Sequence, residues 1–410
     1  MSSVIKIMNK SLLFIFITVL LDVIGLGIII PVTPDLIKEL TGENISEAAK
    51  YSGWLMFSYA IMQFICSPLL GSLSDKYGRR PVLLLSLLTL GLDYFFQALS
   101  PNIVWLFVGR VVAGIGGASF STATAYIADI SEPEKRSQNF GLIGAAFGIG
   151  FIIGPLIGGI VGEYWGTRAS FIIAGILCIL NFAYGYFILP ESLSEANRRD
   201  FSLKEFNPFA TLINLQKFTP ILGLILGEFM LFIANKAVES NWNFFTEYKF
   251  GWDKQTIGIS LAVVGVAVAI VQGYLIRKII PKIGEKKSIY VGIVFETLGL
   301  FLFGLAHKDW MMFAILIPFA LGGIGGAAMQ GVMSNQVNND KLGELQGTIN
   351  GMHSLTYIIG PLMMNQIFYY FTNKNAPIIL PGAPFFVGTA FALVGLWFCH
   401  KNLSKLKSVF

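Results

Sequence analysis

The sequence predicts an all-α membrane protein in which twelve transmembrane helices form two six-helix halves. Hydrophobic residues make up 54% of the 410 residues and charged residues only 13%, and the mean hydropathy is +0.67. A soluble domain is about 25% charged, so this chain has too few charges to cover a water-facing surface. In addition, apolar runs long enough to cross a bilayer recur along the whole chain, and its two halves resemble each other.

Each expected transmembrane helix is a run of about 20 mostly apolar residues, the length that crosses a bilayer. The first run resembles a signal peptide, but no cleavage site of small residues follows it, so we expect it to remain as the first membrane helix. The runs lie at 12–31, 51–71, 82–100, 103–125, 140–162, 169–189, 220–240, 257–276, 288–306, 310–332, 347–371 and 384–400.

The loops between these runs predict orientation and domain boundaries. Most of the 29 Lys and Arg residues fall on one side of the membrane if the N-terminus is cytoplasmic. The positive-inside rule therefore places both termini in the cytoplasm. The polar stretch 190–219 is expected to form a central cytoplasmic loop between an N-terminal half, 1–189, and a C-terminal half, 220–410.

Short motifs recur in the two halves at one constant separation. Phe151-Ile-Ile-Gly-Pro155 in the fifth run returns as Tyr357-Ile-Ile-Gly-Pro361 in the eleventh, and Gly78-Arg-Arg-Pro81 has a weaker counterpart in Gly284-Glu-Lys-Lys287. Two matches at one separation indicate a duplication. Two related six-helix halves are typical of transporters that rock around a site at the middle of the membrane.

Three motifs in the N-terminal half resemble signatures of the major facilitator superfamily. Gly71-Ser-Leu-Ser-Asp-Lys-Tyr-Gly-Arg-Arg-Pro81 is similar to the signature between the second and third helices, and Arg110-Val-Val-Ala-Gly-Ile-Gly-Gly117 to that of the fourth. Gly150-Phe-Ile-Ile-Gly-Pro-Leu-Ile-Gly-Gly159 resembles the fifth-helix motif of proton-coupled antiporters. The resemblance covers essentially the whole chain and implies the major facilitator fold.

A narrower resemblance is to the tetracycline/proton antiporter group of this superfamily. It implies a drug/proton antiporter of the cell inner membrane that exports tetracycline, as its divalent-metal chelate, in exchange for protons and so confers antibiotic resistance. Such a protein is expected to act as a monomer, with Mg²⁺ carried only as part of the substrate. The motifs are Leu21-Asp-Val-Ile-Gly-Leu-Gly27, Pro31-Val-Thr-Pro34, Leu92-Asp-Tyr94, Ala125-Tyr-Ile-Ala-Asp129, Phe250-Gly-Trp252, Met329-Gln-Gly-Val-Met-Ser334 and Leu345-Gln-Gly347.

Two departures from that group leave an alternative open. The group carries a His in the eighth helix that is implicated in proton coupling, whereas this sequence has Val268 or a neighbour there. The seventh run contains Glu228, Lys236 and Glu239, which are not recognised from the drug-resistance members. The alternative is a proton-coupled transporter that exports or imports another drug or a metabolite.

Charged side chains inside the apolar runs are the first candidates for a coupling and substrate site. A charge at the centre of a membrane helix costs about 2.5–3.5 kcal/mol, so it needs a cavity, a partner or a function. The resemblance maps intramembrane acids of the group onto Asp22, Asp93 and Glu296, the last at a position where the group carries Asp. It also favours Gln272 and Gln330 as substrate contacts.

Two pairings of these charged residues are expected. Asp22 and Arg110 form a coupling pair, in which the carboxylate binds a proton or a cationic substrate and the guanidinium pairs with it when empty. The alternative is a static ion pair that fixes helix register. Asp93 and Glu296 occupy equivalent runs of the two halves and suit a cation or a proton. Alternatively, one of them faces a polar vestibule near the membrane surface.

Two further titratable residues stand in the C-terminal half. Glu228 is a candidate to replace the missing His as a proton carrier, because it is an acid inside a membrane run where the sequence departs from the group. His353 in the eleventh run can titrate near neutral pH, but the sequence favours a lone hydrogen-bonded histidine.

The loop after the second run is expected to act as a gate. An acid flanked by bases can form charge contacts that exist in one access state only, a role that the family resemblance implies; positive-inside topology alone explains the bases but not the acid. A second acid–base pair, Asp129 and Arg136, lies on the same side of the membrane and is expected to belong to the same gate. The gating candidates are Gly71, Asp75, Gly78, Arg79, Arg80, Asp129 and Arg136.

The fifth run is expected to pack closely against a neighbouring helix. Gly150, Gly154 and Gly158 repeat at every fourth position and place small residues on one face, and Pro155 permits a bend. Gly159 extends the small-residue set. A pliable, leak-tight interface and plain helix packing are both compatible with this pattern.

Other functions are excluded by what the sequence lacks. Cys66, Cys178 and Cys399 all lie in apolar runs, which suggests neither a disulfide framework nor a metal site. An enzyme would need a nucleophile–base set or metal ligands, but the three His residues are scattered and no HExxH or GxSxG motif is present. We expect no cofactor and no nucleic acid; the expected partners are protons, a small-molecule substrate and the lipid bilayer.

Overall fold

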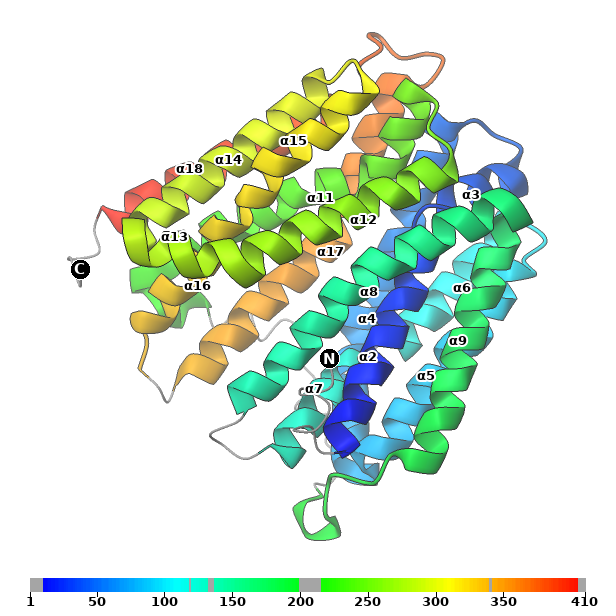
Figure 1. Ribbon diagram of the computed structural model, residues 1–410, viewed down its shortest axis with the longest axis vertical. Helices are drawn as coiled ribbons and strands as arrows, with labels where there is room; N and C mark the ends of the chain where they lie inside the picture. Colours follow the sequence, from blue (N-terminus) through cyan, green and yellow to red (C-terminus); the bar gives the residue numbers. More distant parts are fainter. Residues whose placement is uncertain (1–9, 118, 132–135, 199–214, 339–340, 405–410) are drawn as a thin grey trace. The chain divides into compact units, whose positions relative to one another are not determined.

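The computed structural model describes residues 10–117, 119–131, 136–198, 215–338 and 341–404, and the regular elements within these ranges are helices (Figure 1). The chain divides into two compact units. One unit comprises Met1–Gly42, Ser58–Pro208 and Asp253–Ala262, and the other comprises Glu43–Phe57, Phe209–Trp252 and Val263–Phe410. Compared with the expected halves, two short helical segments are exchanged between the units. Much of the expected central loop, at 199–214, lies outside the described residues.

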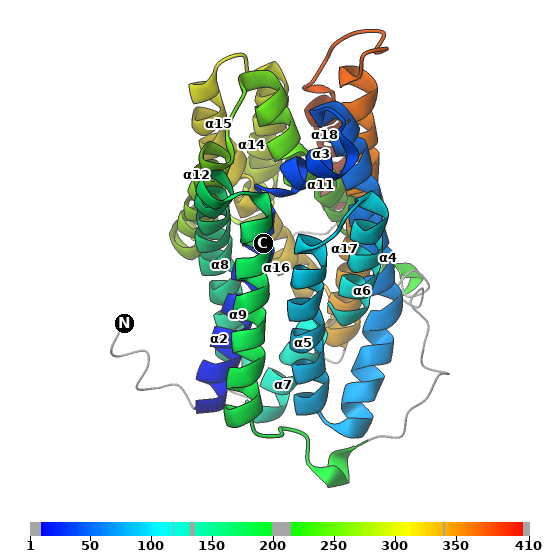
Figure 2. The ribbon, with the colours of Figure 1, turned by 90° about the vertical axis from the view of Figure 1, so that its right-hand side faces the viewer.

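The first unit is built on one close pair of helices. The first and fifth expected spans, α2 and α8, lie side by side, and α9 packs on α2 and on α5 (Figure 2). Its helices are α2 (Lys10–Ile29), α3 (Thr33–Thr41), the later part of α4 (Ile45–Tyr77), α5 (Arg79–Ala98), α6 (Ile103–Gly116), α7 (Ser119–Ile130), α8 (Arg136–Trp165), α9 (Thr167–Ile188), η2 (Glu195–Asn197) and the start of α12 (Lys254–Ile270).

The second unit is organised around α11, which packs on α18 and α17, while α14 packs on α15, α16 and α18 (Figure 1). Trp242, Phe303 and Phe385 are buried where α11, α14 and α18 meet. Its elements are η4 (Leu215–Ile221), α11 (Leu222–Phe250), the rest of α12, η5 (Val271–Leu275), α13 (Ile276–Ile283), α14 (Glu285–Leu305), α15 (Asp309–Leu321), α16 (Gly323–Asn335), α17 (Leu342–Thr372) and α18 (Ala383–Leu403), together with the start of α4.

Helices occupy each of the twelve expected spans. Ten helical segments of the described chain are long and apolar enough to cross a membrane. The two others are the fourth span, where α6 is short and separated from α7 after Gly117, and the eleventh span, where α17 carries many polar residues. The tenth span is also divided, at Gly322 between α15 and α16. Both breaks fall in the glycine-rich motifs, where helix propensity is low.

The weaker of the two repeated motifs, which begins at Gly78 and again at Gly284, has the same backbone conformation at both glycines. Gly78 precedes α5 with φ 104° and ψ 158°, and Gly284 precedes α14 with φ 83° and ψ 157°. A side chain is strained at such positive φ, so both turns need glycine. In the other repeated motif, Pro155 and Pro361 lie inside the long helices α8 and α17, respectively.

Two elements were not expected from the sequence. The short helix α3 follows the first span, and its Asp35 binds Lys254 at the start of α12 (2.8 Å) and Lys38 (2.5 Å). Burial opposes ionisation of Asp35, but these two ammonium groups hold the pKa of its carboxyl below the usual value of 3.8. The second element is the π-helical turn η5, which interrupts the eighth span between α12 and α13.

Candidate functional site

The predicted acid Asp93 is buried on α5, with 4% of its surface exposed. Gln97, one turn later, donates a hydrogen bond to one carboxylate oxygen, while the other, Oδ1, has no partner within the described chain. Gly109 on α6 packs against that free oxygen, because a Cβ there would lie only 3.0 Å from it. The carboxylate is thus enclosed between two helices with one oxygen ready to accept a proton.

Arg110 follows Gly109 on α6, and its guanidinium lies over the ring of Tyr59, 4.6 Å from the ring centroid. Because Gly109, the preceding residue, packs on Asp93, the first unit brings an arginine that is stacked on Tyr59 close to a buried acid.

Asp22 lies on α2, with Oδ1 buried and without a partner among the described atoms. One turn earlier on α2, the carbonyl of Thr18 accepts a hydrogen bond from Asn181 of α9 (3.1 Å). The expected ion pair between Asp22 and Arg110 is not formed in the described part of the chain: the cation stacks on Tyr59 instead. A cation–π contact of this kind partly replaces a carboxylate partner when the cation is shielded from water.

In the second unit, Glu296 on α14 is buried, with 7% exposed. Asn235 on α11 donates a hydrogen bond to its Oε1 (2.6 Å). At the break between α15 and α16, Gly322 packs directly on the Cβ of Glu296. The sequence analysis did not identify Asn235 as a candidate. Its position inside an apolar run, directly before Lys236, is the sequence feature that could have identified it.

Glu228 and Gln330, both predicted, are brought together. Gln330 on α16 donates a hydrogen bond to Oε1 of Glu228 on α11 (3.0 Å), and Gln346 on α17 donates one to Gln330 (3.2 Å). His353 on α17 approaches the same Glu228 oxygen, with 3.9 Å between Nε2 and Oε1. Gln272 is not part of this set: it is exposed in η5 and makes no hydrogen bond to a described residue.

Lys236 is completely buried on α11. Its ammonium group binds Glu239 (2.5 Å), three residues later, and lies 3.3 Å from the centroid of the Tyr357 ring on α17. The neighbouring Gly360 leaves room for the lysine stem. A buried cation is costly without such partners, so Glu239 and Tyr357 together hold the charge in place.

The gating candidates form a cluster within the first unit. The Arg79 side chain donates to Asp75 (2.5 Å), to Ser74 (2.6 Å) and to Asp129 (3.1 Å). A single guanidinium therefore joins α4, α5 and α7, using the fork of donors that only arginine offers. The side chain of Arg136, at the start of α8, lies outside the described part of the structure.

Glu191, after α9, completes the cluster and was missed by sequence analysis. Its carboxylate accepts from the backbone N–H of Arg79 (2.8 Å) and of Arg80 (3.2 Å), which are unpaired donors at the N-terminus of α5. It lies against Gly78, where any Cβ would overlap with it. The Arg80 side chain instead donates to the Tyr186 carbonyl (2.7 Å). The available signal was an acid directly after a proline at the end of a membrane run.

The predicted small residues of α8 lie against neighbouring backbones. Gly154 faces the carbonyl of Ile24 on α2, and Gly158 faces that of Ile28, so a Cβ at either glycine would collide with α2. Gly150 packs on the side chain of Val23. The other predicted packing residues of α8, Gly159 and Pro155, face the first turns of α12 at Lys254 and Gly258. The gating candidate Gly71, on α4, has open space around it.

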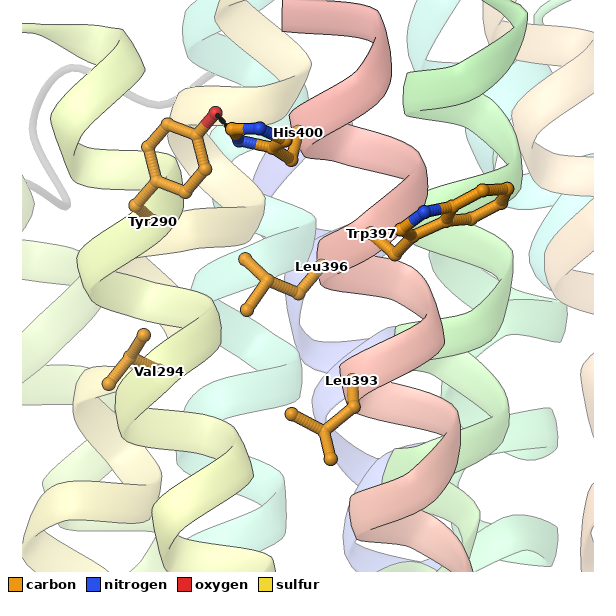
Figure 3. Close-up of a pocket in the computed structure, with 6 residues that line it drawn as sticks. All are labelled: Tyr290, Val294, Leu393, Leu396, Trp397 and His400. Carbon is orange, nitrogen blue, oxygen red and sulfur yellow. Dashed lines mark hydrogen bonds between the residues drawn. The ribbon is translucent and has the colours of Figure 1, made fainter.

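A hollow of about 330 Å³ lies between α14 and α18, away from all of these residues (Figure 3). Tyr290 and His400 close one end through a contact of 3.1 Å between the hydroxyl and Nδ1, and Trp397 lines the apolar remainder with Val294 and leucines. Its open, apolar form suits lipid chains rather than a polar substrate. Among the described residues, no three His, Cys, Asp or Glu side chains are grouped to hold a metal ion.

Comparisons with known proteins agree with this arrangement. Residues 15–361 and 224–406 match the profile of the Major Facilitator Superfamily. The chain is 39% identical to the class C tetracycline resistance protein of Escherichia coli over 360 residues, 88% of this chain and 90% of that one. It is 36% identical to the class B protein of Escherichia coli over 385 residues, 94% of each chain.

Solved structures show the same fold. The match to a bacterial homologue of the human lysosomal transporter Spinster has a TM-score of 0.77 with 16% identity and covers 96% of both chains. The family consists of membrane transporters of small molecules and not of enzymes, as the sequence predicted. The ten candidate membrane-spanning helices of the described chain and the family match over almost the whole chain show that the protein belongs to the major facilitator superfamily.

Proposed function

We propose that the protein is a proton-coupled exporter of a small organic drug, and that its substrate is tetracycline bound to a divalent metal ion. The similarity to tetracycline resistance proteins over almost the entire chain supports this substrate. The protein would work by alternating access as a monomer in the cell inner membrane, with both termini in the cytoplasm.

One observation carries the proposal: each unit holds a buried acid fixed by an amide. Asp93 accepts from Gln97 in the first unit, and Glu296 accepts from Asn235 in the second. An amide donor orients the carboxylate without neutralising it, so its charge can still be matched by a proton or by a cationic substrate. A permanent salt bridge to a basic residue would neutralise the carboxylate, and neither a proton nor a cationic substrate would then be needed to match its charge.

The coupling then follows from charge balance. A buried carboxylate is costly when its charge is unmatched, so protons arriving from outside neutralise Asp22, Asp93 or Glu296 and displace the cationic drug outward. Arg110 stays charged on Tyr59 throughout this exchange, because an arginine does not lose its proton in a protein. Exchange of one proton for a singly charged drug moves no net charge, so the pH gradient drives it. The membrane potential adds about 2.3 kcal/mol per 100 mV only for each proton that enters in excess of the charge on the drug.

The Arg79 cluster is proposed to stabilise one access state. Its three side-chain contacts with Asp75, Ser74 and Asp129 bind the end of α4 to α5 and α7. Contacts of this kind are made and broken together in a two-state transition. Loss of the guanidinium is therefore expected to change how often the transporter switches rather than how tightly it binds substrate.

The test is proton movement in proteoliposomes on addition of tetracycline with and without Mg²⁺. We expect proton release from the wild type that requires Mg²⁺ and that disappears in Asp22→Asn. Inserted, folded protein that releases no proton under either condition would contradict tetracycline antiport.

A second substrate class, organic anions, is favoured by one observation: the cation Lys236 is completely buried. Its carboxylate partner, Glu239, has a half-exposed side chain (47%) and so can be replaced by the anionic group of a substrate. The same assay with organic acids in place of tetracycline distinguishes this alternative, since only an anionic substrate should depend on Lys236.

A further inference from the structure

We propose that Glu228 and His353 form a proton-binding pair within the second unit, separate from the acids described above. Glu228 lies on α11 with 4% of its surface exposed, and Nε2 of His353 on α17 is 3.9 Å from its Oε1. The role of this pair in transport rests on the proposed function, whereas its ability to bind a proton does not.

Both members of the pair have an unused polar atom. Oε2 of Glu228 and Nε2 of His353 are buried and have no hydrogen-bond partner in the described chain. An unsatisfied buried polar atom typically costs about 1–3 kcal/mol. One proton placed on Glu228 satisfies both atoms at once, because the new O–H can donate to the imidazole when the two side chains close to an ordinary distance of about 2.8 Å.

The surrounding amides fix which oxygen of Glu228 takes the proton. Gln330 accepts a hydrogen bond from Gln346 at its oxygen, so its amino group must face Glu228. Oε1 of Glu228 therefore stays occupied as an acceptor. The proton is left with Oε2, the oxygen that has no other partner among the described residues. Because Nε2 of His353 now approaches Oε1, the carboxyl group must turn to bring Oε2 toward the imidazole.

Neighbouring charges decide where the proton rests. Tyr357, one turn beyond His353 on α17, carries the Lys236 ammonium over its ring, and a cation at this place opposes a second positive charge on the imidazole. Glu239 balances Lys236 from the same helix. On α18 the titratable group near Glu228 is the Cys399 thiol, and on α16 the facing group is the neutral Gln330. The proton therefore rests on Glu228, with His353 neutral.

The packing of His353 keeps the pair aligned. Phe232 lies one turn after Glu228 on α11, and its ring centroid is 3.5 Å from that of the imidazole. Glu228, Phe232 and Lys236 therefore share one face of α11, opposite His353 and Tyr357 on α17. The imidazole is held between an aromatic ring and the carboxylate, so a small rotation of Glu228 makes or breaks the hydrogen bond.

The experiment is infrared difference spectroscopy of the purified protein, recorded between alkaline and acidic buffer without any substrate. Because Asp22, Asp93 and Glu296 can add protonated-carboxyl bands of their own, we expect one component of this absorption that is lost completely in Glu228→Gln and shifted in frequency and midpoint in His353→Gln. Glu285→Gln and His400→Gln, which change an acid and a histidine at the membrane ends of α14 and α18, should leave the band unchanged.

An unchanged band in Glu228→Gln would overturn the proposal, and so would a His353→Gln spectrum identical to wild type in correctly folded protein. Because no drug is present, this readout stands even if tetracycline is not the substrate. In proteoliposomes, Glu228→Gln should keep drug exchange at equal pH but lose at least tenfold in proton-driven accumulation. Equal losses in both assays would show a structural role in transport and would contradict the coupling role of the pair, whereas proton binding itself is decided by the infrared band.

Discussion

Asp93 and Glu296 illustrate what single residues reveal in this sequence. Their positions are predictable because charges are rare inside apolar runs, and each charge there needs a physical reason. Their partners, Gln97 and Asn235, are not predictable, because membrane helices also use amides simply to bind one another. The pairing of Arg110 with Tyr59 instead of Asp22 has the same origin: an aromatic ring gives no charge signal in the sequence.

Glu191 is expected to stabilise the start of α5. It accepts from the N–H groups of Arg79 and Arg80, so Glu191→Ala should lower the free energy of unfolding by about 1 kcal/mol, the usual cost of losing a helix cap. The measurement is denaturant unfolding in detergent micelles. The matched control is Glu195→Ala, because the Glu195 side chain is 91% exposed. Equal stability of the two variants would show that the cap contributes nothing.

At the scale of helices, the apolar runs predict where the chain crosses the membrane but not where a helix is interrupted. The breaks at Gly117 and Gly322 occur in motifs that were expected to be continuous spans. Glycine is compatible with both a tightly packed helix and a break, so composition alone cannot decide. The π turn η5 is equally invisible, since it depends on one extra residue per turn and not on residue type.

Close contact of α2 with α8 is expected to depend on Gly158. A methyl group there would collide with the Ile28 carbonyl, so Gly158→Ala should force the helices apart and destabilise the protein by about 1–3 kcal/mol. In the same helix, a methyl group added at Gly148 would meet no other atom within 4 Å in the described structure. Gly148→Ala should therefore be neutral or stabilising by roughly 0.5–1 kcal/mol. The measurement is thermal unfolding of both variants. Similar melting temperatures would show that close contact at Gly158 does not contribute to stability.

At the scale of the whole molecule, composition and the repeated motifs predict the family fold, because burial in lipid leaves few alternatives to bundled helices. The exchange of short segments between the two units was not predictable. It depends on how α4 and α12 pack along their length, and an apolar run carries no information on which neighbour each part will meet.

The distribution of Lys and Arg predicts that both ends of the chain face the cytoplasm. A protease-cleavable tag at each end should therefore be cut in inside-out membrane vesicles and protected in right-side-out vesicles. A tag cleaved only in right-side-out vesicles would mean an odd number of crossings or an inverted protein. A soluble cytoplasmic protein trapped in the vesicles reports their integrity.

The brevity of α6 has a consequence for how the protein is made. Its 14 residues reach about 21 Å, well short of a hydrocarbon core of about 30 Å. The carbonyl of Gly117 at its end accepts from the side chain of Gln63 on α4 (2.9 Å). Since an unpaired carbonyl is costly in lipid, the fourth span, which continues in α7, relies on α4 to satisfy the backbone at the end of α6. The ribosome completes α4 first, so the nascent chain already contains the partner of Gly117 when the fourth span is made.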